Sequence, residues 1–195
     1  MSFQRTVVSN ASAVKIVAVM ALLLAGIELV NFFTGRSLNH LGIIPRETAA
    51  LRGIVLAPFL HGSVMHFMSN IVPFALFSFL LLHHGLIRYI LVSCCCILAT
   101  GSLVWFFGRD AIHVGASGVI YGYFGYLVLA GILSREFKLA FISLIVGFGY
   151  GGLIFGVLPG LPHLSWESHL FGFLTGLFCA FLWGSETRTK ETVAG

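Results

Sequence analysis

Charged residues are scarce in this sequence. Of its 195 residues, 9% are Asp, Glu, Lys or Arg and 58% are hydrophobic, whereas soluble domains have about 25% charged and roughly 45–50% apolar residues. This scarcity excludes a disordered chain, a nucleic-acid-binding module and a water-soluble enzyme of ordinary composition. The mean hydropathy of +0.99 indicates a membrane protein.

Cysteine is scarce as well. Three of the four cysteines form the run Cys94, Cys95 and Cys96 in one apolar stretch, and Cys179 lies in another. This spacing predicts no disulfide framework. The sequence also lacks a cleavage site after a short apolar region near its start. We therefore expect the first apolar run to remain in the mature protein as a membrane span.

Long apolar runs make up most of the chain. A membrane-spanning helix needs about 20 apolar residues, and runs of this length without strand-like alternation favour helices over a barrel. The predicted spans are residues 13–33, 61–82, 86–107, 116–133, 138–158 and 168–184. The connection 34–60 is too polar to span and too apolar to be a simple tether, so we place it in the membrane interface. The fold class is all-α: a single integral-membrane domain over residues 1–195.

The few basic residues predict an orientation. The N-terminus, the second and fourth loops and the C-terminus hold seven Lys and Arg residues, whereas the first, third and fifth loops hold four. Cytoplasmic loops carry the excess of positive charge, so both termini are predicted to be cytoplasmic. The second, fourth and sixth spans then begin at the outer surface.

Small residues recur at helical spacing in three spans. The sets are Gly118, Gly122 and Gly125 in the fourth span, Ser168, Gly172 and Gly176 in the sixth, and Gly147, Gly151 and Gly152 in the fifth. Small residues on one face let membrane helices approach closely. We therefore expect close packing at all three faces.

Polar side chains begin the second, fourth and sixth spans. His66 and Asn70 are four residues apart and share a helix face, as do Ser117 and Tyr121, and the sixth span begins near His169. Isolated polar groups are costly in lipid, so their convergence at one depth predicts a water-accessible polar pocket.

This set of residues suits nucleophilic catalysis. A serine needs a neighbouring base, and histidine is the side chain best matched to neutral pH, so Ser117 and His169 are the candidate pair. Ser117 lies at a helix start, where backbone N–H groups and the helix dipole favour an oxyanion. His66 and Asn70 can add side-chain donors. The alternatives are helix-packing roles for Ser117 and His169, and for His66 and Asn70 a role in interhelical hydrogen bonding.

Three motifs resemble those of the rhomboid intramembrane serine proteases. Gly115-Ala116-Ser117-Gly118 with Tyr121 resembles the Gly-x-Ser-Gly helix of that family, and His169 in a glycine-containing last helix resembles its partner. The His-x4-His-x3-Asn pattern is matched by His61, His66 and Asn70. The resemblance covers residues 61–184, and the six-span layout with a long first loop is similar to the bacterial GlpG type.

The resemblance implies a role for each of these residues. Ser117 is the nucleophile and His169 the general base and acid, with no carboxylate as a third member. Tyr121 packs against His169, while His66, Asn70 and the Ser117 N–H hold the oxyanion. The supporting residues implied by the motifs are Gly115, Gly118, Gly172 and His61, the two glycines at 118 and 172 allowing close helix approach and His61 being structural. Glu167 is two residues from His169 and therefore projects away from its face.

The implied activity is an endopeptidase that cleaves transmembrane or juxtamembrane segments of membrane proteins. The resemblance places it in the bacterial inner membrane, with its active site open to the periplasmic side. The expected partners are transmembrane protein substrates and membrane lipid, with no nucleic acid and no cofactor. Substrates are expected to have a small residue before the cut and helix-weakening residues nearby.

The chain also departs from the family pattern. Leu51-Arg52 stands where rhomboids usually have Trp-Arg, and His83-His84-Gly85 stands where a Glu close to a Gly is common. Both places concern the stability of the scaffold. We expect neither the soluble N-terminal domain of some bacterial members nor a seventh helix.

Two other functions stay open. One is a non-catalytic relative that binds transmembrane helices, which the presence of both Ser117 and His169 argues against. The other is a transporter or proton channel with His66, His169 and Glu28 as a relay, which the lack of an internal duplication argues against. A zinc site is not expected, because His61 and His66 are five residues apart and do not share a helix face.

Four further predictions concern the remaining polar groups and glycines. Glu28 and Asn31 are expected to anchor the first loop. The other histidines are expected to be interfacial loop residues, namely His40, His83, His84, His113 and His163. The glycine-rich fifth span and the loop around Pro159 and Pro162 are candidates for a substrate gate. We expect no metal ion in the site.

Overall fold

A computed structural model describes residues 8–134, 136–159 and 164–184. Within these ranges the chain forms α-helices, short 3-10 helices and one isolated β-bridge. In chain order the helices are α1 (Asn10–Phe33), η1 (Ser37–Leu41), η2 (Thr48–Ala50), α2 (Gly53–Leu56), η3 (Ala57–Phe59), α3 (Val64–Leu82), α4 (Leu86–Phe107), α5 (Ser117–Ser134), α6 (Phe137–Tyr150), η4 (Gly151–Val157) and α7 (Trp166–Trp183). Some residues used in the sequence predictions lie outside these ranges. They are Pro162 and His163, and four of the basic residues counted for the orientation, Arg5, Arg135, Arg188 and Lys190.

The prediction of an all-α membrane bundle is confirmed. In the described part of the chain, five helical segments are long and apolar enough to cross a membrane: α1, α3, α4, α5 and the continuous stretch Phe137–Val157. The sixth predicted span corresponds to α7, which begins with Glu167, Ser168 and His169 and is not among the five.

Side-chain caps set the starts of two helices. α3 begins at Val64, later than the predicted residue 61, because the Ser63 side chain accepts a hydrogen bond from the backbone N–H of His66. α7 begins at Trp166, where Ser165 caps the N–H of Ser168 in the same way. Each cap fixes where the first helical turn starts.

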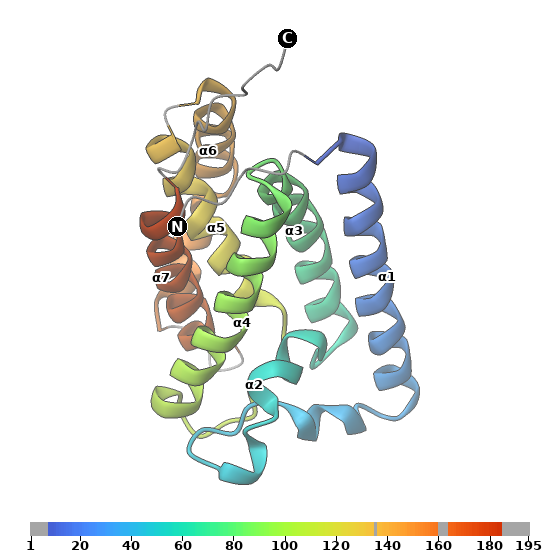
Figure 1. The fold of residues 1–195 in the computed structure, drawn as a ribbon. Coiled ribbons are helices and arrows are strands. Elements are labelled where there is room, and N and C mark those ends of the chain that lie inside the picture. The colour runs from blue at the N-terminus through green and yellow to red at the C-terminus, as the bar shows by residue number, and fades with distance from the viewer. Residues whose placement is uncertain (1–7, 135, 160–163, 185–195) are drawn as a thin grey trace.

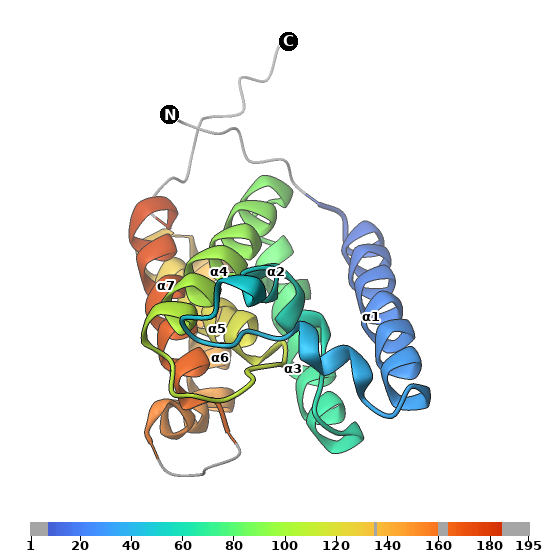
Figure 2. The same ribbon diagram turned by 90° about the horizontal axis from the view of Figure 1, so that it is seen from below.

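The long helices run alternately up and down, and α5 lies in the middle of the bundle. In Figure 1, α3, α5 and α7 all begin at the end of the bundle that carries α2 and the first loop. Of the residues in α5, 72% are buried, against 17–28% for the other four candidate spans. Figure 2, seen from below, shows α1 at the edge of the bundle beside α3. The polar starts of three helices therefore lie at one end of the molecule.

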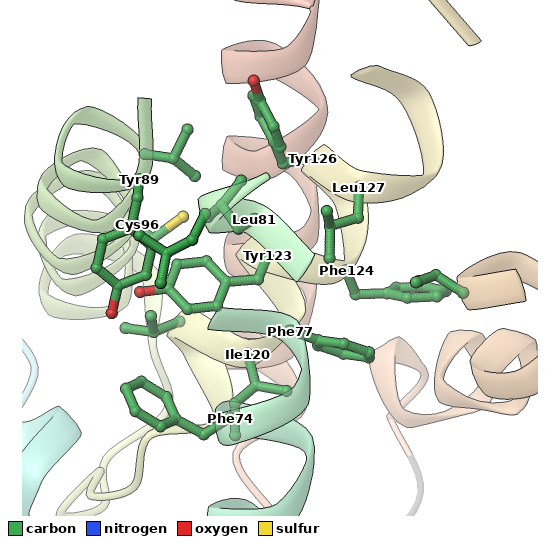
Figure 3. Packing of buried hydrophobic residues seen from close by; sticks show 14 of the residues in the cluster. Phe74, Phe77, Leu81, Tyr89, Cys96, Ile120, Tyr123, Phe124, Tyr126 and Leu127 are labelled. Carbon is green, nitrogen blue, oxygen red and sulfur yellow. The ribbon is translucent and has the colours of Figure 1, made fainter. Parts of the chain in front are cut away.

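Aromatic side chains of α3 and α4 pack against those of α5. The ring of Tyr123 lies between those of Phe74 and Tyr89, at centroid distances of 6.1 and 6.0 Å, and Phe77 stacks on Phe124 at 6.2 Å (Figure 3). The Tyr123 hydroxyl is hydrogen-bonded to Ser93 at 2.7 Å, which satisfies its polar end inside an apolar core. This core holds α3, α4 and α5 in fixed register.

The first loop is tied to the connection between α4 and α5. Ile43 and His113 exchange two backbone hydrogen bonds, of 3.0 and 2.8 Å, and the Gly115 N–H donates to the Ala57 carbonyl at 2.9 Å. The indole N–H of Trp105 donates to the Glu47 carbonyl at 3.0 Å. These contacts make the first loop one wall of the bundle end where Ser117 begins α5.

Two of the expected interfacial histidines are buried. His113 is 3% exposed, because its ring contacts the Ser165 hydroxyl at 2.7 Å and the Arg109 carbonyl at 3.0 Å. His84 is fully buried against the ring of Tyr126, at a centroid distance of 5.3 Å. Both lie in connections between helices, as predicted, but the sequence did not predict their burial, because Tyr126 and Ser165 are distant in sequence.

The glycine faces of α5 and α7 pack closely, but those of α6 do not. A Cβ at Gly172 would overlap the Gly118 carbonyl oxygen, and a Cβ at Gly176 would overlap that of Gly122. The glycines of the fifth predicted span, Gly147 of α6 and Gly151 and Gly152 of η4, were predicted to pack closely as well, and that prediction was wrong. A Cβ at Gly147, Gly151 or Gly152 would meet no atom of a neighbouring segment within 4 Å.

The predicted anchors in α1 are confirmed. Glu28 pairs with Arg36 of the first loop, with 2.7 Å between Oε1 and Nη1. The side-chain amide of Asn31 donates to the Asn39 side chain at 2.9 Å. Both anchors are buried, so the side chains of Glu28 and Asn31 face the first loop and not lipid.

Candidate active site

Ser117 is the first residue of α5. The residue two positions before it, Gly115, has a φ of 125°, which favours glycine and turns the chain sharply into the helix. The Ile120 N–H is bonded to the Ala116 carbonyl at 3.0 Å, so the N–H groups of residues 117–119 precede the helical ladder. Ser117 therefore combines a half-buried side chain with backbone donors free of helical partners.

His169 lies in the first turns of α7 and is 7% exposed. Its Nδ1 is 2.9 Å from the carbonyl oxygen of Gly156 in η4. A carbonyl can only accept, so Nδ1 carries the proton and, in the neutral ring, Nε2 has the free lone pair. The Tyr121 ring stacks on the imidazole with 4.2 Å between centroids and 4° between planes. These two contacts fix both the tautomer and the plane of His169.

The close contact between α5 and α7 brings Ser117 and His169 to the same level. Gly172 packs directly on the Gly118 carbonyl, and a Cβ at Gly118 would lie 3.4 Å from the carbonyl oxygen of Ser168. Ser117 and His169 directly adjoin these contact residues in the sequence. Among the described residues, no hydrogen bond joins the Ser117 hydroxyl to the His169 ring, and such bonds are often formed only once substrate is bound.

The His66 imidazole of α3 lies beside Gly115, close to the Ser117 side chain. A Cβ at Gly115 would lie 2.7 Å from His66 Nε2 and 3.8 Å from the Ser117 hydroxyl oxygen, so glycine at this position leaves room for the imidazole. His66 Nδ1 accepts a hydrogen bond from the Gly62 N–H at 3.4 Å. The proton of the neutral ring is therefore on Nε2, the nitrogen that faces the Ser117 side.

Asn70 lies beside this pair, one helical turn further along α3. Its Nδ2 donates to the His66 carbonyl at 2.6 Å and to the Ser69 hydroxyl at 3.5 Å. Its Oδ1 is buried without a hydrogen-bond partner in the described structure. Asn70, His61 and Ala116 line one small void, so the amide lies close to the peptide unit that precedes Ser117.

His61 packs against His66 at the buried side of the site. It is 1% exposed, and its ring makes an edge-to-face contact with that of His66 at 5.2 Å between centroids. Burial, together with the charges of His66 and Arg36, lowers the pKa of His61 to about 3. The described residues contain no group of three His, Cys, Asp or Glu that could hold a metal ion.

Glu167 is buried beside His169 in the sequence but faces another partner. Its Oε1 is 3.5 Å from Nε of Arg109 and 3.4 Å from the backbone N of the same residue. Arg109 also donates to the Leu164 carbonyl. Glu167 thus ties the start of α7 to the connection before α5, and it does not orient the imidazole.

Gly156 is the site residue that the sequence did not reveal. A Cβ at this position would overlap the Tyr121 hydroxyl and lie 3.4 Å from His169 Nδ1. The only sequence signal is its place in the glycine-rich end of the predicted fifth span, where it follows Gly147, Gly149, Gly151 and Gly152. The residue that its carbonyl contacts, His169, is thirteen residues away, beyond the reach of helical spacing.

The fold and this site define an integral membrane protein with a polar cluster at one end of a helical bundle. The model of the Rhomboid domain family matches residues 48–186. The uncharacterized protein Rv1337 of Mycobacterium tuberculosis is 32% identical over 198 residues, covering 97% of this chain and 81% of that protein. The uncharacterized protein ML1171 of Mycobacterium leprae is 34% identical over 189 residues, covering 92% and 74%. The chain belongs to the rhomboid family, a family of intramembrane serine proteases.

Proposed function

We propose that this protein is an intramembrane serine endopeptidase in which Ser117 attacks the substrate carbonyl and His169 accepts the serine proton. The observation that carries the proposal is the hydrogen bond between His169 Nδ1 and the Gly156 carbonyl. This bond holds the imidazole in the tautomer whose Nε2 can accept a proton, the task that a carboxylate performs in three-residue catalytic sites.

The oxyanion has donors from two helices. As Ser117 Oγ bonds to the carbonyl carbon, negative charge develops on the substrate oxygen. The backbone N–H of Ser117 and the Nε2–H of His66 supply donors to that oxygen, and the Asn70 amide, whose second N–H makes only a long 3.5 Å bond to the Ser69 hydroxyl, is a third candidate. One well-placed donor stabilises such a transition state by about 3 kcal/mol.

The reaction then follows the acyl-enzyme course. His169 Nε2–H gives its proton to the leaving amine, the C–N bond breaks, and the C-terminal fragment departs with a new amino terminus. Water, deprotonated by His169, attacks the acyl-Ser117 ester and releases the carboxylate product. A helical substrate must unwind near the cut, because the carbonyls of an intact helix are hydrogen-bonded and shielded.

The proposed substrates are transmembrane proteins that reach Ser117 through the lipid. The predicted orientation has both termini in the cytoplasm and the starts of α3, α5 and α7 at the periplasmic face of a bacterial inner membrane. The basic residues of the loops support this orientation.

The test is labelling with a fluorophosphonate serine probe, combined with cleavage of a transmembrane reporter in liposomes. The purified wild type is compared with Ser117→Ala, His169→Ala and Ser12→Ala, the last an exposed serine of α1. We expect the first two variants to lose labelling and cleavage and the third to keep both. A folded wild type that binds the reporter without labelling or cleavage would instead indicate a helix-binding role.

A further inference from the structure

The carbonyl oxygen of His61 is held by three side chains. Arg36 Nη1 donates to it at 2.9 Å, Asn39 Nδ2 at 3.2 Å and Asn31 Nδ2 at 3.3 Å. A carbonyl oxygen has two lone pairs, so this acceptor is saturated. The donors come from α1, η1 and the turn between them, and the carbonyl lies just before α3. α1 and the first loop thus converge on one peptide oxygen.

Buried charge holds these donors in place. Glu28 of α1 is 6% exposed and pairs with Arg36 at 2.7 Å, using the same Nη1 that reaches the His61 carbonyl. Asn31 is fully buried, and its Oδ1 accepts from the Leu38 backbone N–H at 3.2 Å. Hydrogen bonds to a buried charged group are costly to lose. We call Glu28, Asn31, Arg36 and Asn39 the carbonyl clamp.

The clamp acts on His66 through a planar peptide bond. The His61 carbonyl and the Gly62 N–H belong to one trans peptide unit, so they point in opposite directions and cannot turn independently. The Gly62 N–H is the donor to His66 Nδ1 at 3.4 Å. Fixing the carbonyl therefore aims the N–H at His66, and this hydrogen bond places the ring proton on Nε2.

The geometry points to the carbonyl clamp as a positioning device that sets the tautomer and orientation of His66. Arg36 is its central member, because it links Glu28 to the His61 carbonyl. The inference rests on the proposed function, since it gives the clamp a catalytic consequence through the oxyanion donor. α1, at the edge of the bundle, then contributes to the site without touching substrate (Figure 2).

The ring of His61 supports the same assignment. It contacts His66 edge-to-face at 5.2 Å and lies 4.0 Å from Glu28. Its pKa of about 3 keeps it neutral at physiological pH, so it adds no positive charge beside His66. Packing against an uncharged ring limits rotation of the His66 imidazole and leaves the Gly62 N–H as the group that selects its tautomer.

The test combines nitrogen NMR of the histidine rings with kinetics on the detergent-solubilised full chain. In the wild type, His66 is expected to show a protonated Nε2 and an unprotonated Nδ1. In Arg36→Gln we expect both tautomers and a kcat about 10-fold lower with KM little changed, because complete loss of an oxyanion donor costs about 100- to 1,000-fold. Arg36→Lys, which keeps the charge and a donor, is expected to restore most of the rate.

Two controls separate positioning from general loosening of the first loop. Arg46→Gln breaks a different tie of that loop, to the Gly108 carbonyl and Asp110, and should leave the His66 tautomer unchanged. In a His66→Ala background, Arg36→Gln should cause no further fall in kcat. If Arg36→Gln does not fold, Asn39→Ala removes one half-buried clamp donor and serves as the milder variant.

The outcomes are distinct for the two proposals. A single unchanged His66 tautomer with full kcat in Arg36→Gln, or an equal fall in kcat when His66 is already alanine, overturns the clamp. A wild type that is not labelled by the fluorophosphonate probe overturns the proposed function. The tautomer of His66 is read by NMR in either case.

Discussion

Two glycine-rich helix faces of this protein differ in what they contact. Where α5 meets α7, the backbones touch, so that a Cβ at Gly172 or Gly176 would overlap a carbonyl of the other helix. On α6, the glycines at 147 and 149 have no atom of a neighbouring segment within 4 Å of a Cβ position. The same residue type thus serves a rigid contact in one region and leaves a surface open in the other.

This difference in packing divides the site into a rigid part on α5 and α7 and a less tightly packed part on α6 and η4. Ser117 and His169 lie on the two helices with the close contact. α6 is fastened to α5 in its first half, where a Cβ at Gly131 would overlap the Leu139 carbonyl oxygen and the Ser143 hydroxyl donates to the Leu127 carbonyl. Its far half leads to η4 and Gly156. Packing therefore favours α6 over α5 or α7 as the element that moves when a substrate enters.

The largest expected effect comes from adding one methyl group to the close contact. Gly172→Ala places a Cβ against the Gly118 carbonyl, which is backbone and cannot turn away. We expect a loss of about 1–3 kcal/mol in stability, together with loss of probe labelling. Gly147→Ala is the matched control in α6 and should be neutral or stabilising by up to about 1 kcal/mol. Equal thermal unfolding curves for the two variants would contradict the proposed difference in packing between the two glycine faces.

The second prediction concerns Gly156 of η4, whose carbonyl contacts His169. Gly156→Ala should lower kcat by about 10-fold, because the Cβ displaces Tyr121 from its stack on the imidazole, a contact of about 0.5–1.5 kcal/mol. Removing the hydroxyl in Tyr121→Phe should restore most of the rate in the double variant. Gly152→Ala, in the same 3-10 segment but facing open space, is the control.

A double-mutant cycle on cleavage rates decides this point. Strong coupling between positions 156 and 121 is expected, because one Cβ and one hydroxyl compete for the same space. Additive effects would show that Gly156 acts in another way.

The smallest expected effect tests α6 as the gate. Phe77 of α3 and Tyr150 of α6 meet edge-to-face at 4.9 Å between ring centroids. Cysteines at these two positions, joined by a short bifunctional thiol reagent in a background without native cysteines, should slow cleavage of the transmembrane reporter several-fold. Labelling by the small fluorophosphonate should be unaffected, because the probe needs no opening for a helix. If the cross-linked protein cleaved the reporter at the same rate as the uncross-linked protein, α6 would not be the gate.

The features that the sequence predicted well depend on local patterns. The apolar run at 86–107 matches α4, Leu86–Phe107, because Gly85 and Gly108 flank it. Ser117 begins α5 as expected from the glycine motif, and the small-residue faces of α5 and α7 pack together. Helical spacing sets which of these residues share a face.

The features that the sequence did not predict depend on contacts between distant segments. The predicted span 138–158 matches the continuous stretch Phe137–Val157, but the change from α6 to the 3-10 helix η4 after Tyr150 was not predicted. His113 is buried by Ser165, which is 52 residues away. The Gly156 carbonyl acquires its role only when α7 is in place. No local pattern encodes such pairings, because each needs the folded bundle to bring its two partners together.

The length of α5 differs from that of the spans around it. α5 has 18 residues, which at about 1.5 Å per residue is about 27 Å, less than the roughly 30 Å hydrocarbon core. The other four candidate spans are longer, with 19 to 24 residues, and far less buried, so they and not α5 are the segments that match the lipid. Ser117, at one end of this short central helix, is therefore surrounded by protein at a depth that the bundle sets.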